Sequence, residues 1–288
     1  MASPGANLRR LLADHPIMIP GAFNALTAKL AEQLGFEAVY LSGGALSAGW
    51  AGLPDIGLLT LTEFTEAAAV LARATNLPLL CDADTGFGEA VNVERTVRLF
   101  EEAGAAGLHL EDQVLPKRCG HLSGKALVDV PTMAAKLRAA VAARRDPDFV
   151  IVARTDARSV EGFEAAVARA QAYQAAGADG IFPEALESEA EFARFAEEVQ
   201  VPLLANMTEF GRSPLLDFAT LAGMGYRGVL YPLTAFRAAM KAATETLAEL
   251  RTRGTQRGLL GRMQTRAELY DLLRYDDWEA RDRSFMGG

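Results

Sequence analysis

The chain has 288 residues, half of them hydrophobic, with 29 basic side chains against 37 acidic ones. A chain of this length can bury a large hydrophobic core. It can form either a single barrel or two ordinary domains. No stripe of Lys and Arg is present that would neutralise a phosphate backbone, which argues against a nucleic-acid partner. No charged-then-apolar leader opens the chain, and no apolar stretch approaches the roughly 20 residues that span a bilayer. We therefore expect a cytoplasmic protein without a membrane partner.

A repeated junction predicts alternating helices and strands. At Gly35, Gly104, Gly177 and Gly225 an Ala-rich or Leu-rich helical stretch ends, and a short apolar run follows within a few residues. Gly suits the left-handed residue that ends a helix, and an apolar run after it is typical of a parallel strand buried on both faces. Further apolar runs, which bring the predicted strands to eight, lie at residues 16–20, 77–82, 149–153 and 201–205.

Helical periodicity follows the predicted strands. The expected helices cover residues 25–34, 60–74, 92–103, 131–144, 161–176, 187–199, 214–223 and 234–253. Strict alternation over this length favours a (β/α)8 TIM barrel over an open doubly wound sheet, in which fewer strands and a Gly-rich phosphate loop are usual. We predict that residues 1–288 form a single α/β barrel domain.

Residues 254–288 are predicted to be a C-terminal helical extension beyond the complete barrel. Helical periodicity resumes at 263–278 and carries Leu269, Leu272 and Leu273, which need a surface to cover. That surface can belong to a partner subunit or to the chain's own barrel, and a helix folded back on itself fits the pattern equally well.

Polar residues follow the predicted strands at the end of the barrel where chemistry occurs in this fold. In chain order they are Ser42 to Gly44, Asp82 and Asp84, Glu111, Arg154, Glu184, and Asn206 and Thr208. Strand ends built only for stability would not need so many acidic groups, an Arg and an Asn at one mouth. We predict an active site there.

Asp82 and Asp84 are separated by one residue of a predicted strand, so we expect their side chains to point the same way and to serve one hard cation. An isolated pair of this kind is more often a cap or a turn. Here Glu111 ends the neighbouring strand, and three carboxylates without a nearby Lys would repel one another unless a divalent ion lay among them. Oxygen-only ligands favour Mg2+ or Mn2+ over Zn2+.

Two further strand ends suggest anion binding. Residues 42–44 offer backbone N–H groups with no Cβ at the two glycines, although a plain tight turn would look the same. Arg154 would be costly to bury unpaired, so it pairs with Asp156 or Glu184 or meets an anionic substrate, and we favour the substrate. His109, inside the fourth strand, is expected to be a hydrogen-bonded core histidine.

The segment Lys117-Arg118-Cys119-Gly120-His121 lies in the loop after the fourth strand. Two cations and an imidazole around one thiol are expected to stabilise its thiolate, and Gly120 lets the loop move. Such a thiol can donate or accept a proton or act as a nucleophile, whereas the alternative is an inert Cys in a basic surface loop. The other cysteine, Cys81, is expected only to pack.

These residues in this order resemble the isocitrate lyase and phosphoenolpyruvate mutase superfamily, most closely its methylisocitrate lyases. The likeness extends from about Ile17 to Tyr275. The matching segments read YLSGG, GLPDIG, DADTGFG, AGLHLEDQ, KRCGH, VARTDA, FPEA, ANMTEFG, YPLTAFRA and MQTRAELY. The resemblance implies a barrel whose terminal helix is exchanged between the subunits of a homotetramer.

The resemblance also implies roles for individual residues. Ser42, Gly43 and Gly44 would hold a substrate carboxylate, Asp82 and Asp84 would bind Mg2+, with Mn2+ as a possible substitute, Glu111 would support the metal's water shell, and Asp55 would line the site. The implied catalytic residues are Cys119, Arg154, Lys117 and His121. The implied further substrate contacts are Cys119, Gly120, Arg154, Glu184, Asn206, Thr208, Arg237 and Arg266.

The implied reaction is a retro-Claisen cleavage of a small tricarboxylate, 2-methylisocitrate, to pyruvate and succinate, as in the methylcitrate cycle of propionate catabolism. Isocitrate lyase and dimethylmalate lyase stay open as alternatives, because one methyl group provides only about 1 to 3 kcal/mol of discrimination. The KRCGH motif and the lack of long insertions favour the methylated substrate. Oxaloacetate decarboxylases generally lack the Cys motif. A non-enzymatic binding barrel would lack one or more of the polar residues expected at the strand ends, and none of them is missing here.

Overall fold

The computed structural model describes residues 2–122 and 124–286, and its frame is a set of eight parallel strands. These are β1 (Ile17–Pro20), β2 (Val39–Leu41), β3 (Leu79–Asp82), β4 (Gly107–Glu111), β5 (Val150–Thr155), β6 (Gly180–Pro183), β7 (Leu204–Asn206) and β8 (Gly228–Tyr231). Each overlaps a predicted apolar run. The apolar composition of these runs is explained by their burial, since most of their residues are inaccessible to solvent.

The strands follow one another around a closed circuit. β2 to β6 pair in sequence order, and β8 lies between β1 and β7, with every pairing parallel. Single bridges, Gly21 with Tyr40 and Ile181 with Leu203, join the two sheets at both seams. A doubly wound sheet would leave two strands with a free edge, so the cyclic order confirms the α/β, barrel-like fold over the open alternative.

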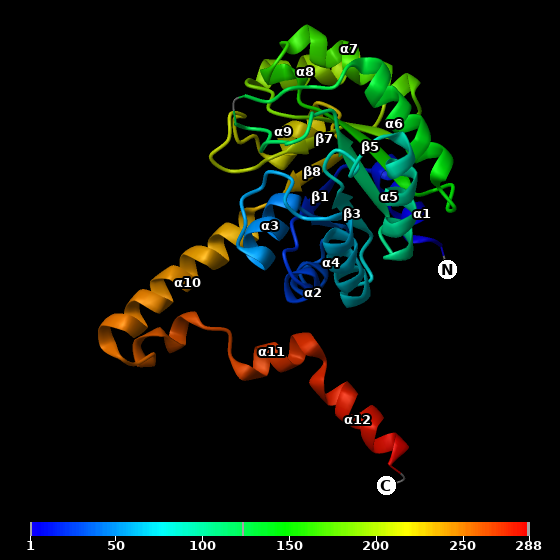
Figure 1. The fold of residues 1–288 in the computed structure, drawn as a ribbon. Coiled ribbons are helices and arrows are strands. Elements are labelled where there is room, and N and C mark those ends of the chain that lie inside the picture. The colour runs from blue at the N-terminus through cyan, green and yellow to red at the C-terminus, as the bar shows by residue number, and fades with distance from the viewer. Residues whose placement is uncertain (1, 123, 287–288) are drawn as a thin grey trace. The chain divides into compact units, whose positions relative to one another are not determined.

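Helices alternate with the strands, and Figure 1 shows several of them on the outside of the sheet. They are α2 (Ala25–Gln33), α4 (Leu61–Ala74), α5 (Ala90–Glu102), α6 (Val130–Ala143), α7 (Phe163–Ala175), α8 (Glu189–Glu198) and α9 (Phe218–Gly223). Their apolar side chains, such as the fully buried Phe64, Phe100 and Tyr173, form one cluster with the outer faces of the strands. α4 begins where the sequence predicts, because Thr60 and Glu63 form a capping box.

Two helices were not predicted, α1 (Pro4–Asp14) and α3 (Gly43–Ala51). α1 places Leu8, Leu11 and Leu12 in the same buried cluster as the side chains that fill the inside of the barrel. The cluster includes the residues that begin or precede the strands, so α1 closes the amino-terminal end of the barrel. The opposite end is left for the polar residues that end the strands.

The chain divides into two compact units, Met1–Phe236 and Arg237–Gly288. α10 (Thr234–Arg253) has the predicted bounds and crosses this division, and a short 3-10 helix (Arg257–Arg262) follows it.

The single helix predicted at 263–278 is wrong in detail. Arg274 adopts a left-handed φ of 54° and separates α11 (Arg266–Leu273) from α12 (Tyr275–Phe285). Leu272 is buried, whereas Leu273 is exposed. None of the helices in the described part of the chain has the length and apolar character required to cross a membrane.

Candidate active site

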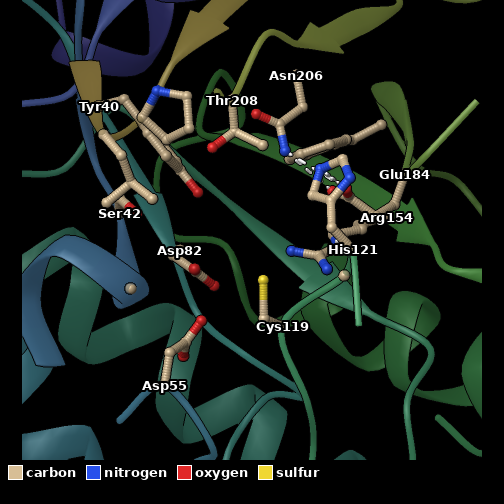
Figure 2. Close-up of a pocket in the computed structure, with 15 residues that line it drawn as sticks. Tyr40, Ser42, Asp55, Asp82, Cys119, His121, Arg154, Glu184, Asn206 and Thr208 are labelled. Atoms are coloured by element: carbon tan, nitrogen blue, oxygen red, sulfur yellow. Dashed lines mark hydrogen bonds and ion pairs between the residues drawn. The ribbon is translucent and has the colours of Figure 1, made fainter. Parts of the chain in front are cut away.

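Most of the polar residues predicted at the strand ends line one pocket at the carboxyl end of the barrel (Figure 2). Its walls are Tyr40, Ser42, Gly44, Asp55, Asp82, Cys119, Gly120, His121, Arg154, Phe182, Glu184, Asn206, Thr208, Pro232 and Leu233. Four other predicted residues contact these walls from behind, namely Gly43, Asp84, Glu111 and Lys117. Arg237 and Arg266 belong to the second compact unit, so their contact with substrate stays a prediction.

The segment Ser42 to Gly44 begins helix α3 and is not a plain turn. Ser42 Oγ accepts the N–H of Ala45 at 3.3 Å and caps the helix. The N–H of Gly43 donates to Asp82 Oδ2 at 3.0 Å, and a Cβ at Gly43 would lie only 2.8 Å from that oxygen. Gly44 lines the pocket. The amino end of α3, which carries the partial positive charge of a helix N-terminus, therefore borders the cavity and suits a carboxylate.

The two aspartates after β3 are arranged differently from the prediction. Asp82 ends the strand, but Asp84 lies beyond it with a left-handed φ of 44°, so the expectation that both side chains project from one strand is wrong. Instead, the N–H of Asp84 donates to Asp82 Oδ1 at 2.9 Å. Lys117 Nζ lies 2.7 Å from Asp84 Oδ1 and also pairs with Asp55, so the expected lack of a nearby Lys is wrong as well.

Burial and neighbouring charges act in opposite directions on these groups. Burial raises the pKa of Asp84 to about 7 and holds the pKa of Glu111 well above its usual range. Burial alone would raise the pKa of Asp82, but His109, whose ring is charged only in acid, and the cations Lys117 and Arg154 outweigh burial and lower that pKa. Burial alone would lower the pKa of Lys117, and the surrounding carboxylates raise it instead. Lys117 is therefore a fixed cation among acids.

The carboxylates fit a hydrated divalent cation. Asp82, Asp84 and Glu111 offer oxygen donors only, which Mg2+ prefers. Glu111 Oε1 is buried and has no hydrogen-bond partner. Nowhere within residues 2–122 and 124–286 do three or more His, Cys, Asp or Glu side chains converge as a ready metal cluster. Mg2+ commonly keeps several waters and is bound through one or two carboxylates, so it does not require such a cluster.

Arg154 pairs with carboxylates and also faces the pocket. Its Nε and Nη2 donate to Asp156 at 3.0 and 3.1 Å. Its Nη1 lies 3.3 Å from Glu111 Oε2, and its Nε lies 3.6 Å from Glu184 Oε2. The guanidinium also lies over the Phe182 ring, 5.3 Å from its centroid. Three carboxylates therefore hold one cation at the wall of the cavity, oriented for an anionic ligand.

The side chain of Cys119 points into the pocket and is partly exposed (Figure 2). The expectation of a stabilised thiolate is wrong, because burial raises the pKa of the Cys119 thiol. The loop cations do not compensate, since Lys117 turns to the carboxylates and His121 Nε2 lies 2.7 Å from Glu184 Oε1. The thiol is protonated at neutral pH, and this state suits a proton donor better than a nucleophile.

His121 connects the Cys119 loop to two other strand ends. Its Nδ1 accepts the N–H of Arg212 at 3.0 Å, and its Nε2 faces Glu184 Oε1. Asn206 Nδ2 donates to Glu184 Oε2 at 3.2 Å. Burial would raise the pKa of Glu184, but Arg154 and His121 lower it, so this carboxylate stays charged. The loop is thereby held over the pocket by polar contacts.

Sequence reasoning missed Tyr40 as a pocket residue. Tyr40 lies two residues before Ser42, and this period-two spacing at the end of β2 was the available signal. Its Oη lies 2.7 Å from Nε2 of His109, which is fully buried. The prediction of a hydrogen-bonded core histidine at 109 is thus confirmed, and burial lowers the pKa of His109 to about 4, so that the ring is neutral at pH 7.

A parallel α/β barrel whose strand ends carry carboxylates, a guanidinium and a protonated thiol around one pocket defines a barrel enzyme. The chain belongs to the phosphoenolpyruvate phosphomutase family, which it matches over residues 8–251. This membership confirms the superfamily resemblance that the sequence motifs indicated.

Relatives support the same family and extend it over nearly the whole chain. A 2-methylisocitrate lyase of Aeropyrum pernix is 53% identical over 280 residues, which are 97% of this chain and 90% of the relative. The crystal structure of a 2,3-dimethylmalate lyase is similar with a TM-score of 0.93 and 36% identity, covering 100% of this chain and 97% of the other. A phosphonopyruvate hydrolase in complex with oxalate and Mg2+ has a TM-score of 0.90 and 34% identity, covering 99% and 100%.

Proposed function

We propose that this protein is a carbon–carbon lyase that cleaves 2-methylisocitrate to pyruvate and succinate. The observation that carries the proposal is the 53% identity to a 2-methylisocitrate lyase over 97% of the chain. The dimethylmalate lyase neighbour, at 36% identity, supports the same class of reaction and makes dimethylmalate the second candidate substrate. The pocket offers the groups that such a cleavage needs, namely anion donors, acidic oxygens and a proton donor.

We propose that the substrate carboxylates bind at two places. The amino end of α3, at Ser42, Gly43 and Gly44, presents the partial positive charge of a helix N-terminus to one carboxylate. Arg154, oriented by Asp156, presents its guanidinium to another. Glu184, Asn206 and Thr208 line the same cavity and are proposed to contact the polar groups of the substrate, together with Arg237 and Arg266 of the second unit.

We propose that Asp82 and Asp84 hold Mg2+, that Glu111 is bound to it through water, and that Mn2+ can replace it. The solved relative with oxalate and Mg2+ supports a divalent ion in this family. Such an ion, when bound, polarises the hydroxyl and the adjacent carboxylate of a hydroxy acid. Lys117 and Asp55 lie beside this cluster and are proposed to adjust its charge.

Cys119 is proposed to supply the proton of the reaction. When the carbon–carbon bond breaks, the hydroxyl proton passes to a site carboxylate or to hydroxide, a keto group forms on the pyruvate half, and the bonding electrons move to the succinate half. The Cys119 S–H donates its proton to that carbon, so that succinate is released and the thiolate is reprotonated before the next turnover. Arg154 and His121, on the same wall, stabilise the negative charge as it develops.

We propose that residues 1–288 act as one barrel domain with a helical extension at 254–288, exchanged between the subunits of a cytoplasmic homotetramer without a nucleic-acid or membrane partner. In support, the second unit exposes large apolar side chains, among them Leu247, Leu260, Trp278 and Phe285. Light scattering on the purified protein should give four times the chain mass of 30.8 kDa. The mass of a monomer would contradict this part of the proposal.

The test of the function is pyruvate release in the presence of Mg2+ from 2-methylisocitrate, with isocitrate, 2,3-dimethylmalate and oxaloacetate in parallel and EDTA as a control. We expect EDTA-sensitive formation of pyruvate and succinate, fastest from 2-methylisocitrate. Preference for another of these acids would keep the reaction class and change the substrate. Turnover that persists after complete removal of divalent metal would contradict the proposed Mg2+ site.

A further inference from the structure

We propose that Lys125 is a positioning residue, whose buried ammonium group ties the loop that carries Cys119 to the carboxylate that orients Arg154. Lys125 lies just beyond the KRCGH segment and has no role in the proposed function so far. Its effect on turnover rests on that function, whereas its effect on the loop does not.

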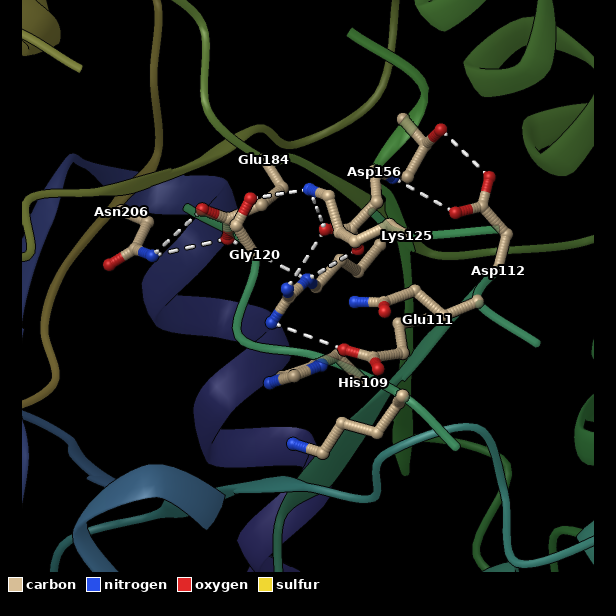
Figure 3. Close-up of polar contacts among 12 residues, drawn as sticks. His109, Glu111, Asp112, Gly120, Lys125, Asp156, Glu184 and Asn206 are labelled. Atoms are coloured by element: carbon tan, nitrogen blue, oxygen red, sulfur yellow. Dashed lines mark hydrogen bonds and ion pairs between the residues drawn. The ribbon is translucent and has the colours of Figure 1, made fainter. Parts of the chain in front are cut away.

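The contacts of Lys125 join two parts of the site that are far apart in the sequence (Figure 3). Its side chain is only 1% exposed. Nζ donates to Asp156 Oδ1 at 2.7 Å and to the backbone carbonyl oxygen of Gly120. Gly120 directly follows Cys119, and Asp156 follows β5. A single ammonium group therefore holds the backbone beside the proposed proton donor against the wall of the barrel.

Asp156 is a rigid attachment point. Its N–H donates to Asp112 Oδ1 at 2.9 Å. The other oxygen of Asp112 accepts the hydroxyl groups of Thr155 at 2.9 Å and of Tyr173 at 2.8 Å. Tyr173 belongs to α7 and is fully buried in the core. These groups cannot move without disturbing the core. Lys125 therefore fixes the position of the loop relative to the core.

The charge of Lys125 also affects Arg154. One guanidinium meets three carboxylates, those of Asp156, Glu111 and Glu184. Lys125 supplies a second cation to Asp156, so Arg154 is not the only charge that balances this buried acid. Without Lys125, Arg154 would be drawn more strongly to Asp156 and would be less available to a substrate carboxylate.

A shift of the loop that carries Cys119 would change the geometry of the pocket. A Cβ at Gly120 would overlap Arg154 Nη2 and Glu184 Cγ, so the Gly120 backbone lies directly against this ion pair. Any displacement of the backbone away from Lys125 moves Cys119, the next residue, relative to Arg154. The anchor therefore sets the distance between the proton donor and the group that is proposed to bind the substrate.

The protein offers a matched control at the other end of the barrel. Arg144 Nη1 donates to the carbonyl oxygen of Phe149 at 2.9 Å and to Asp179 Oδ2 at 2.7 Å. Its side chain is 13% exposed. Like Lys125, it joins a backbone carbonyl to a carboxylate, but Phe149 and Asp179 precede β5 and β6, so this bridge lies at the amino ends of the strands. Arg144→Met should cost stability without affecting the Cys119 loop.

The experiment compares Lys125→Met with Arg144→Met in the full-length enzyme. The first measurement is the rate at which iodoacetamide alkylates Cys119 without substrate, which is site-specific because Cys81 is fully buried. The second is kcat and KM for 2-methylisocitrate, with thermal unfolding as a check on folding. For Lys125→Met we expect alkylation about 10-fold faster and kcat about 10- to 100-fold lower, since one charge-assisted hydrogen bond and the loop geometry are lost. Arg144→Met should match the wild type in both.

Each outcome bears on the proposal. Wild-type alkylation and kcat in a folded Lys125→Met variant would overturn it, as would an equal effect of Arg144→Met on the loop. If Lys125→Met does not fold, Lys125→Gln removes the charge and shortens the side chain by one atom, which should loosen the link between Gly120 and Asp156; wild-type behaviour of that variant would overturn the proposal in the same way. If the wild type does not cleave 2-methylisocitrate, the proposed function fails, while the alkylation rates still test the anchor.

Discussion

Replacing the thiol of Cys119 by a hydroxyl tests the central step of the proposed chemistry. Cys119 points into the pocket, and its pKa is raised by burial. The thiol is therefore the protonated, acidic form at neutral pH. In Cys119→Ser the hydroxyl is a far weaker acid, so the proton would reach the succinate half only from water. We expect kcat to fall about 100- to 10,000-fold, the usual contribution of a positioned general acid.

The same substitution should hardly change stability. Cys119 lies in a loop between β4 and α6 and does not belong to either buried hydrophobic cluster. A change of one atom at a partly exposed site of this kind alters the free energy of unfolding by about 0.5 kcal/mol or less. Urea unfolding of both proteins, monitored by circular dichroism, therefore separates a chemical effect from a loss of fold.

The pH dependence provides a second readout of the same step. A proton donor is active below its pKa and is lost as the pH rises through it. Because burial raises the pKa of Cys119, the alkaline decrease in kcat should lie above the ordinary thiol value of about 8.5. The assay is pyruvate release from saturating 2-methylisocitrate with Mg2+. A Cys119→Ser variant that keeps more than a tenth of wild-type kcat, or a wild-type rate that increases as the thiol ionises, would refute the proton-donor role.

Two further predictions concern neighbouring groups. In Gly120→Ala the new Cβ would overlap Arg154 Nη2 and Glu184 Cγ, so steady-state kinetics should show a higher KM and a lower kcat; unchanged values would contradict the close packing. For His109, burial lowers the pKa from 6.5 to about 4, so the unfolded chain binds the extra proton between these values and stability falls as the pH decreases. This group should contribute a loss of about 2 kcal/mol between pH 7 and 5 in urea unfolding, and His109→Gln should show a shallower decrease.

Local sequence patterns predicted the strands and most helices because the pattern of apolar residues within each segment reflects which of its faces are buried. Runs such as Val150–Thr155 are apolar along most of their length since both faces of a barrel strand are covered. Helix α4 was found at its first turn because Thr60 and Glu63 cap it within four residues. α1 was missed because its apolar face covers the end of the barrel, a partner that lies outside the segment. The break at Arg274 was missed because a left-handed Arg carries no sequence signal.

Sequence patterns predicted most of the polar residues at the mouth of the barrel, since the alternation of helices and strands brings the carboxyl ends of all strands together. It did not determine how these residues pair. Lys117 turned out to lie among the aspartates, and Cys119 proved to be a protonated thiol, because ion pairing and burial depend on side chains from different loops. Lys125 could not be recognised at all, since Asp156 lies 31 residues away. Charges and pKa values follow from three-dimensional neighbours, and only the tertiary structure decides those.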